Sequence, residues 1–89
     1  MKSHLTAKFI DCFQRLPDHT KRSARRSYQL WQKNPKHPSL QFKRVGKKRQ
    51  VYSVRVGIGW RALGVKYRDV MVWFWIGSHA EYDSFLKQL

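Results

Sequence analysis

The sequence of 89 residues has few acidic residues and almost no cysteine. Five Asp and Glu stand against 19 Lys and Arg, which gives a formal net charge of +14, and Cys12 is the single cysteine. One cysteine excludes an internal disulfide and a zinc site built from several thiolates. Because the five acids are scattered along the chain, two-carboxylate and two-metal chemistry are disfavoured. We expect neither a metal nor a cofactor.

Long apolar runs and nucleotide-binding motifs are also missing. No stretch approaches the roughly 18 apolar residues that a membrane span needs, and the opening segment MKSHLTAKFIDCFQRL has no uninterrupted apolar run of the kind found in signal peptides. The patterns GxxxxGK[ST], GxGxxG and HExxH do not occur. We therefore expect a cytoplasmic protein that does not associate with a membrane.

The residues that are present are strongly basic and aromatic. Apolar residues make up 42% of the chain, with four Trp, four Tyr and five Phe, which is enough for one compact domain over residues 1–89. Residues 1–49 hold 14 Lys and Arg but two Asp. Such an excess attracts the phosphate backbone of a nucleic acid or an acidic protein. A membrane surface is a less favoured partner, because the basic residues do not lie opposite an apolar face that could insert into lipid.

The spacing of apolar residues predicts two helices followed by a sheet. Spacings of three and four indicate a first helix that Pro17 ends and a second that Asp18 caps. Their apolar stripes are Leu5, Phe9, Phe13 and Leu16, and then Ala24, Tyr28 and Trp31. From Leu40 the period becomes two, which predicts strands near residues 40–45, 51–56, 60–65 and 70–76.

The end of the sequence predicts a short helix. We expect Gly77 to end the last strand and Ser78 and Glu81 to form a capping box. The apolar stripe of this helix is Tyr82, Phe85, Leu86 and Leu89. The order of elements indicates an α+β fold in which a two-helix N-terminal hairpin packs on a small antiparallel sheet, with a short C-terminal helix.

Three residues near two expected turns suit metal-free cleavage of RNA. That reaction needs a base for the 2′-hydroxyl proton, cations for the charge that builds on the phosphate and an acid for the leaving 5′-oxygen. Arg55 and Arg61 flank a tight turn, and His79 opens the last helix, so the three can converge. The alternatives are a merely basic surface for the two arginines and an ordinary capping-turn histidine.

Other candidates also have two interpretations. Tyr82 is either core or a contact to a base or phosphate, and Trp60 is either a packing residue or a stacking platform for a nucleotide. Lys43, Lys47, Lys48 and Arg49 fit phosphate contacts, with a solvated turn as the alternative for the last three. Lys21, Arg22, Arg25 and Arg26 lie off the stripe of the second helix and form either a solvated face or a contact to RNA or an acidic partner.

Three blocks of the sequence resemble a known superfamily. The blocks NPKHPSLQFKRV, YSVRVGIGWRALGV and VWFWIGSHAEYDSFL are similar to the RelE/ParE superfamily of bacterial type II toxin–antitoxin toxins, over roughly residues 9–86. The resemblance implies a small basic toxin that forms a hetero-oligomer with a cognate antitoxin. In the RelE-like branch, the toxin enters the ribosome and cuts mRNA through 2′-hydroxyl attack.

The resemblance also implies roles for particular residues. Arg55 falls where the RelE-like branch has a strand cation, Arg61 matches its aromatic-Arg motif and His79 matches its Gly-[Ser/Thr]-His terminus, while Tyr82 is a looser match. Two features depart from the family pattern. The strand that usually precedes the first helix is short or absent here, and Ser53 stands where ribonucleases of the family often have a second cation.

The favoured hypothesis is therefore a ribosome-dependent mRNA endoribonuclease with Arg55, Arg61, His79 and Tyr82 as its catalytic group. RNA would bind through Lys43, Lys47, Lys48, Arg49 and Trp60, and the antitoxin through Lys21, Arg22, Arg25 and Arg26. Two alternatives share the fold. One is a ParE-type inhibitor of DNA gyrase without nuclease activity, and the other is a degenerate toxin that only binds its antitoxin.

Overall fold

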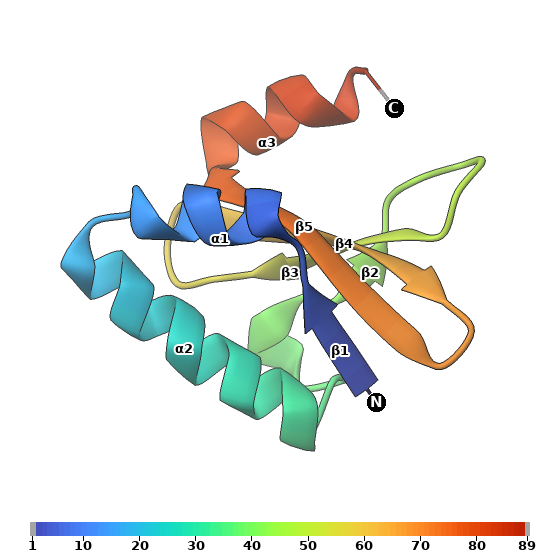
Figure 1. The fold of residues 1–89 in the computed structure, drawn as a ribbon, viewed down its shortest axis with the longest axis horizontal. Coiled ribbons are helices and arrows are strands. Elements are labelled where there is room, and N and C mark those ends of the chain that lie inside the picture. The colour runs from blue at the N-terminus through green and yellow to red at the C-terminus, as the bar shows by residue number, and fades with distance from the viewer. Residues whose placement is uncertain (1, 89) are drawn as a thin grey trace.

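The computed structural model describes residues 2–88. Met1 and Leu89, the latter expected to continue the last apolar stripe, lie outside the described residues. Along the chain the elements are β1 (Lys2–Leu5), α1 (Ala7–Gln14), α2 (Asp18–Lys33), the 3-10 turn η1 (Pro38–Leu40), β2 (Lys43–Arg44), β3 (Val51–Arg55), β4 (Trp60–Tyr67), β5 (Val70–Ser78) and α3 (His79–Leu86) (Figure 1). Among these helices none is long and apolar enough to cross a membrane.

The sheet is mixed, whereas the sequence predicted an antiparallel one. Its strand order is β1-β5-β4-β3-β2, and all neighbours are antiparallel except β1 and β5, which run parallel. The first strand, expected to be short or absent, exists over four residues at the edge beside β5. Its residues are mostly exposed, so they carry no alternating apolar signal from which the pairing could be predicted.

The second helix follows its predicted stripe, but the first is shorter than its stripe implied: α1 covers Ala7–Gln14, so Leu5 lies in β1 and Leu16 follows the helix. Both helices also differ from the prediction at their caps. Thr6 caps α1, because its hydroxyl oxygen accepts a hydrogen bond from the backbone N–H of Phe9 at 3.1 Å. Asp18 does not cap α2 as expected; Pro17 occupies the cap position, and the Asp18 carboxylate lies in the first turn, where it complements the helix dipole. Trp31 is fully buried, which confirms the stripe of this helix.

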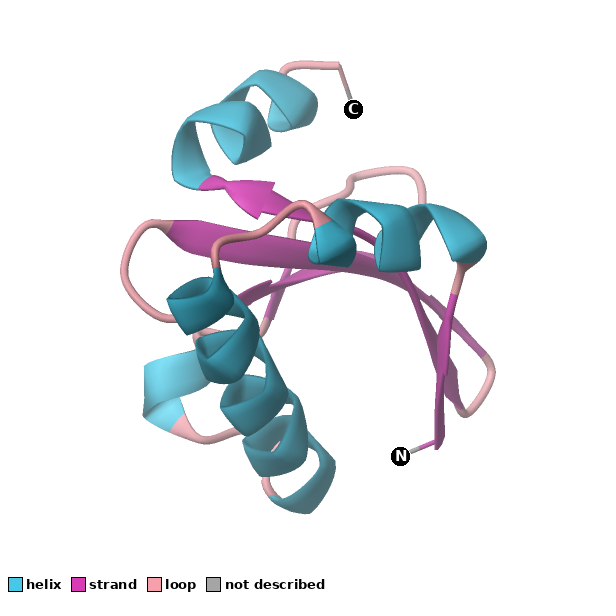
Figure 2. Ribbon diagram, turned by 60° about the vertical axis from the view of Figure 1, so that its left-hand side comes forward, coloured by secondary structure: helices cyan, strands magenta, loops and turns pink. Residues whose placement is uncertain are grey.

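The sheet separates two apolar clusters. The larger one packs residues of α1 and α2, among them Phe13 and Trp31, against Val54, Ala62 and Trp73 of the sheet. The smaller one packs α3 on the opposite face, where its buried members are Val51, Leu63, Trp75 and Tyr82. Figure 2 shows the sheet nearly edge-on, with α3 above it and α2 below. The last strand is thus covered on both faces, as its continuous apolar run predicted.

Several strand boundaries differ from those predicted: β4 runs to Tyr67 and β5 to Ser78, beyond the predicted ends at residues 65 and 76. The run at residues 40–45 forms a strand only at Lys43–Arg44, because Pro38 starts a 3-10 turn and Gln41 adopts a left-handed backbone with φ 46°. Gly77 lies within β5 instead of ending it. A Cβ atom at Gly77 would stand 2.5 Å from the Trp75 ring, so the glycine permits a close ring contact inside the strand.

Candidate active site

Arg55 and Arg61 are direct cross-strand partners at one end of β3 and β4. The chain turns between them at Gly57-Ile58-Gly59, where both glycines have positive φ angles of 61° and 82°. The same row of the sheet continues from Arg61 to Gly77 on β5. Directly opposed residues in adjacent strands project to the same face, so the two arginine side chains leave the sheet next to each other.

Arg61 is held by an aromatic ring and a loop side chain. Its guanidinium carbon lies 5.6 Å from the centre of the Tyr82 ring. One terminal nitrogen donates a hydrogen bond to the Gln41 side-chain oxygen at 2.7 Å. The other terminal nitrogen, Nη1, is buried and has no hydrogen-bond partner within residues 2–88. The guanidinium is therefore fixed in place while part of its hydrogen-bonding capacity is unused.

Tyr82 is a buried residue of the smaller cluster. It is 4% exposed, and its hydroxyl donates to the Ser53 hydroxyl at 3.2 Å. Ser53 is itself fully buried in β3. Because the hydroxyl is engaged below the surface, the ring serves as a platform for Arg61. Of the two interpretations of Tyr82, core and contact to the RNA, the structure thus favours the core.

His79 is the first residue of α3 and lies beside the turn that joins the two arginine strands. Its backbone N–H donates to the Gly59 carbonyl at 2.8 Å. The predicted capping box is present: the Ser78 hydroxyl accepts from the Glu81 N–H, and the Glu81 carboxylate accepts from the Ser78 N–H. The imidazole is 5.7 Å from the Tyr82 ring, and its Nε2 lies 3.5 Å from an Asp83 carboxylate oxygen.

The grouping is open to solvent and dominated by positive charge. The His79 side chain is 51% exposed, so its ring can reach a bound molecule. In the described part of the chain no Lys or Arg is paired with a carboxylate, and the contact of His79 with Asp83 is an ion pair only when the imidazole is protonated. Arg61 and His79 therefore both lie against the Tyr82 ring, and Arg55 is opposite Arg61 on the next strand.

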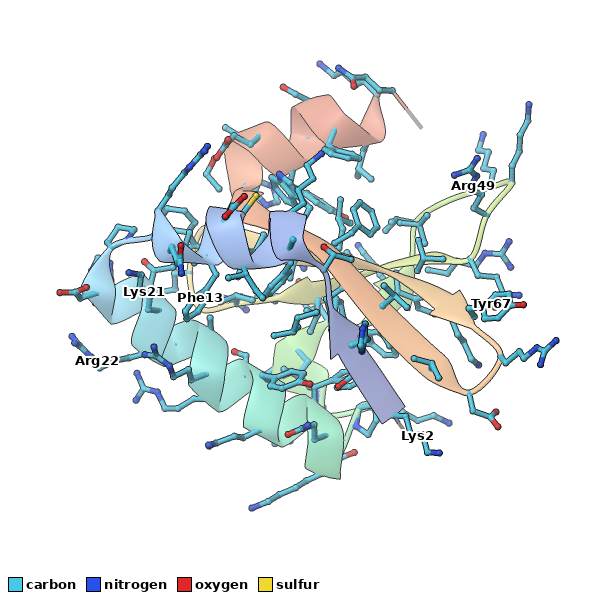
Figure 3. All side chains as sticks on the ribbon, viewed as in Figure 1. Lys2, Phe13, Lys21, Arg22, Arg49 and Tyr67 are labelled. Atoms are coloured by element: carbon cyan, nitrogen blue, oxygen red, sulfur yellow. The ribbon has the colours of Figure 1, made fainter. Side chains whose placement is uncertain are left out.

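The residues predicted to bind RNA separate into three positions. Lys43 is exposed on β2 directly opposite Ser53 and so shares the face of the arginines. Lys47, Lys48 and Arg49 are exposed at the tip of the β2–β3 loop, at the other end of β3 from Arg55 (Figure 1), and Figure 3 shows Arg49 projecting outward there. Trp60 packs against the larger cluster on the opposite face from Arg61, so the structure does not bring it to this site.

Comparison with known proteins places this chain in a family. The sequence model of the ParE-like toxin domain family matches residues 18–84, which is most of the chain. The chain belongs to this family. The membership agrees with the RelE/ParE resemblance of the three sequence blocks and identifies a toxin domain of the toxin–antitoxin type. No curated protein sequence matches the chain.

Solved structures of related toxins share the fold of this ParE-like toxin domain. The antitoxin–toxin complex RelB-RelE from Methanococcus jannaschii matches with a TM-score of 0.74 and 13% identity, over 92% of this chain and 96% of that chain. The isolated RelE toxin of E. coli matches with a TM-score of 0.65 and 10% identity, over 99% and 98%. The YoeB/ParE toxin from Agrobacterium tumefaciens gives 0.67 and 13%, over 89% and 99%. The predicted RelE/ParE-like α+β fold is confirmed.

The basic residues of α2 were expected to contact an antitoxin or RNA, and one of them, Arg26, lines a cleft together with Arg55. Arg22, Arg25 and Arg26 are exposed, and Lys21 is partly buried. Figure 3 shows Arg22 on the outer side of α2. The Arg25 guanidinium lies over the Phe13 ring of α1 at 5.2 Å, so it also covers apolar surface of the hairpin.

Three functional neighbours in this ParE-like toxin were not predicted from the sequence. Gln41 reaches Arg61 only because the left-handed turn after η1 directs the chain toward β4, and no sequence signal indicates that. Ser53 was noted as a missing cation, not as the partner of Tyr82. Asp83 could have been found, since it stands four residues after His79 on a predicted helix. Within residues 2–88 no three His, Cys, Asp or Glu side chains gather as metal ligands.

Proposed function

We propose that this ParE-like toxin is a metal-independent endoribonuclease that cuts mRNA on the ribosome and so blocks translation in the cytoplasm. The observation that carries the proposal is the grouping of Arg55, Arg61 and the half-exposed His79 at one end of the sheet, with neither arginine paired to a carboxylate within residues 2–88. Metal-free cleavage needs cations for the phosphate and a group that carries a proton, and these side chains are of that kind.

The chemistry follows from the 2′-hydroxyl of the RNA itself. The 2′-oxygen forms a bond to the adjacent phosphorus, and the bond from phosphorus to the 5′-oxygen breaks. The 2′-hydroxyl gives up its proton and the leaving 5′-oxygen gains one, which yields a 2′,3′-cyclic phosphate and a 5′-hydroxyl. His79 serves as the base for the first proton or as the acid for the second. Arg55 and Arg61 stabilise the negative charge of the phosphorane-like transition state.

Tyr82 and Lys43 both neighbour Ser53 and have different roles in the proposal. Tyr82 is a positioning residue, because its hydroxyl is bound to Ser53 and its ring lies under the Arg61 guanidinium. Lys43 stands directly across from Ser53 on β2 and is exposed. It supplies positive charge to the face on which RelE-like nucleases often have a second cation at the Ser53 position. The charge is thus provided from the neighbouring strand.

A cognate antitoxin is the second partner in the proposal. The net charge of +14 and the exposed Arg22 and Arg25 of α2 favour an acidic, amphipathic antitoxin segment. We expect a toxin–antitoxin hetero-oligomer whose affinity falls with salt, but less steeply than RNA binding does. The RelB-RelE complex of similar fold supports such an assembly.

Inhibition of DNA gyrase is the alternative function. The family model that matches the chain carries the name of the ParE-like toxins, which favours this second candidate. A gyrase inhibitor acts through its surface and does not need the His79 side chain. Induction would then raise DNA-damage signalling instead of stopping translation. A degenerate toxin that only binds its antitoxin would give no growth phenotype.

A cleavage assay separates these functions. A 5′-labelled mRNA is incubated with the purified toxin in the presence of translating ribosomes, without ribosomes, and without ribosomes in excess EDTA. We expect cuts only where ribosomes are present. EDTA-resistant cutting of naked RNA would indicate a ribosome-independent nuclease. The absence of cuts in every reaction would overturn the nuclease proposal, and a gyrase supercoiling assay with the same preparation would test the alternative.

A further inference from the structure

A cleft with a mixed lining lies between α2 and the turn that joins β3 to β4, and its apolar lining residues are Leu30, Leu40 and Ile58. Its volume is about 370 Å³, and its polar lining residues are Ser23, Arg26, Ser27, Ser39 and Arg55. It adjoins the candidate active site, because Arg55 lines it and is also the cross-strand partner of Arg61. The sequence comparison with RelE-like nucleases assigns no role to this cleft.

The lining of the cleft has the chemistry of an anion site. Its lining includes two arginines and three serines, and none of its lining residues is acidic. An arginine guanidinium matches the oxygens of a phosphate with paired N–H donors, and serine hydroxyls donate to the remaining oxygens. Within residues 2–88 neither Arg26 nor Arg55 forms an ion pair with a carboxylate.

Contacts at the turn hold the cleft in shape. The turn packs close to α2 at Gly57, where a Cβ atom would stand 3.4 Å from the Cβ of Ser23. Gly57 has a φ of 61°, a conformation that glycine adopts at little cost. The Nε of Arg55 donates to the Gly57 carbonyl at 3.3 Å. That bond fixes the guanidinium beside the turn and leaves its two terminal nitrogens for a ligand.

An exposed apolar side chain borders the two arginines. Ile58, at the tip of the turn, is 87% exposed and also lines the cleft. A large aliphatic side chain beside an anion site fits a ligand that carries both charge and a flat apolar surface. A nucleotide has both, in its phosphate and its base. An acidic peptide would meet the arginines but would not need Ile58.

We propose that this cleft binds a phosphate of the RNA strand next to the phosphate that is cut. Arg26 and the serine hydroxyls hold this phosphate, Arg55 stands between it and the phosphate that is cut, and Ile58 contacts the attached nucleoside. The inference rests on the proposed nuclease function and deepens it, because it gives the strand a direction across the protein, from Arg61 past Arg55 toward α2. It also moves Arg26 from the antitoxin surface to the RNA surface.

The test compares two exposed arginines of α2 that lie one turn apart. Arg26→Gln removes a cleft residue, whereas Arg22→Gln removes the same charge from a residue that does not line the cleft. The probe is a fluorescent 2′-O-methyl RNA hexanucleotide, which has no free 2′-hydroxyl and so cannot be cut by the proposed reaction. Anisotropy is measured between 50 and about 300 mM KCl, because the slope of log affinity against log salt counts phosphate contacts.

The expected results differ clearly between the variants. Arg26→Gln should weaken binding about tenfold at a fixed salt concentration and reduce the salt slope by about 0.7, the value for one lost contact to a single strand. Arg22→Gln should change the affinity and the salt slope much less. Thermal unfolding followed by circular dichroism should show the same transition for both variants and the wild type.

Three outcomes would overturn the cleft assignment. They are equal losses in the two variants, no binding of the probe by the wild type at 50 mM KCl, and binding of an oligo-aspartate peptide that depends on Arg26 while RNA binding does not. The last result would assign the cleft to an acidic protein. Failure of the nuclease proposal appears separately, as wild-type protein that binds the hexanucleotide through Arg26 but cuts no mRNA on ribosomes.

Discussion

The guanidinium of Arg61 lies over the ring of Tyr82, 5.6 Å from its centre, and the hydroxyl of Tyr82 is bound to the buried Ser53. A surface cation is thereby positioned by a residue of the core. This arrangement costs little entropy at the moment a phosphate binds, since the guanidinium is already ordered by Tyr82 and Gln41. The position of the Arg61 charge therefore depends on how Tyr82 packs in the core.

Tyr82 should tolerate loss of its hydroxyl but not of its ring. In Tyr82→Phe the platform for Arg61 is retained and the hydrogen bond to Ser53 is lost, so the free energy of unfolding should fall by about 1 kcal/mol while mRNA cleavage changes little. In Tyr82→Leu the ring is gone, and cleavage should fall about tenfold. Denaturant unfolding and single-turnover cleavage on ribosomes measure the two effects. Equal loss of cleavage in both variants would mean that the hydroxyl takes part in the chemistry.

Removing the Arg61 guanidinium should impair the reaction more than it impairs folding. Arg61→Gln should lower the cleavage rate about 100- to 1000-fold, the usual effect of deleting one transition-state donor. Arg68→Gln is the matched control, because Arg68 is exposed at the β4–β5 turn and stacks on Tyr67. It removes the same charge at the other end of β4 and should leave cleavage nearly unchanged. Similar losses of cleavage in both variants would mean that Arg61 contributes only to the overall positive charge and not to a specific site.

His79 should be required for cleavage but not for folding. His79→Gln should slow cleavage roughly 100- to 10,000-fold, the range for loss of a general acid or base. The capping box of Ser78 and Glu81 does not involve the imidazole, so the thermal transition and binding to the antitoxin should be preserved. Growth after induction gives an independent readout. A His79→Gln protein that still arrests growth while mRNA remains intact would support the gyrase alternative.

Gly77 should resist substitution because of the ring that it faces. A Cβ atom would stand 2.5 Å from Trp75 and 3.2 Å from a Glu81 carboxylate oxygen. Gly77→Ala should therefore reduce the free energy of unfolding by about 1–3 kcal/mol through overpacking. Ser78→Ala, which removes only the cap of α3, should cost about 1 kcal/mol. Chemical denaturation of the two variants measures whether Gly77→Ala loses more unfolding free energy than Ser78→Ala. A Gly77→Ala protein as stable as the wild type would show that the ring moves aside without cost.

The sequence predicted the elements better than their connections. The stripe containing Trp31, the capping box at Ser78 and the two-sided burial of β5 all arise from local spacing, which a pattern can express. The parallel pairing of β1 has no such signal, because those four residues are mostly exposed. Similarly, the strand expected at residues 40–45 is shortened by the backbone of Gln41, which depends on the turn that precedes it.

The candidate site was predictable as a set of residues but not as a geometry. Arg55 and Arg61 could be paired from the sequence because a short turn of two glycines joins their strands. The contact of Arg61 with Tyr82 and Gln41 could not, since it depends on how α3 and the loop after η1 pack against different strands. Trp60 is a different case, because strand alternation already places it on the opposite face from Arg61; assigning both residues to one RNA site was inconsistent with that alternation.

The central claim is that the RNA is cut by its own 2′-hydroxyl at the Arg61 and His79 site. The most direct measurement uses an mRNA whose cut position has been mapped on ribosomes and then replaced by a single 2′-deoxynucleotide. We expect cleavage at that position to disappear while cuts at unmodified positions persist and end in 2′,3′-cyclic phosphates. Cleavage that continues at the 2′-deoxynucleotide would contradict the account, because the attacking oxygen would then have to come from water.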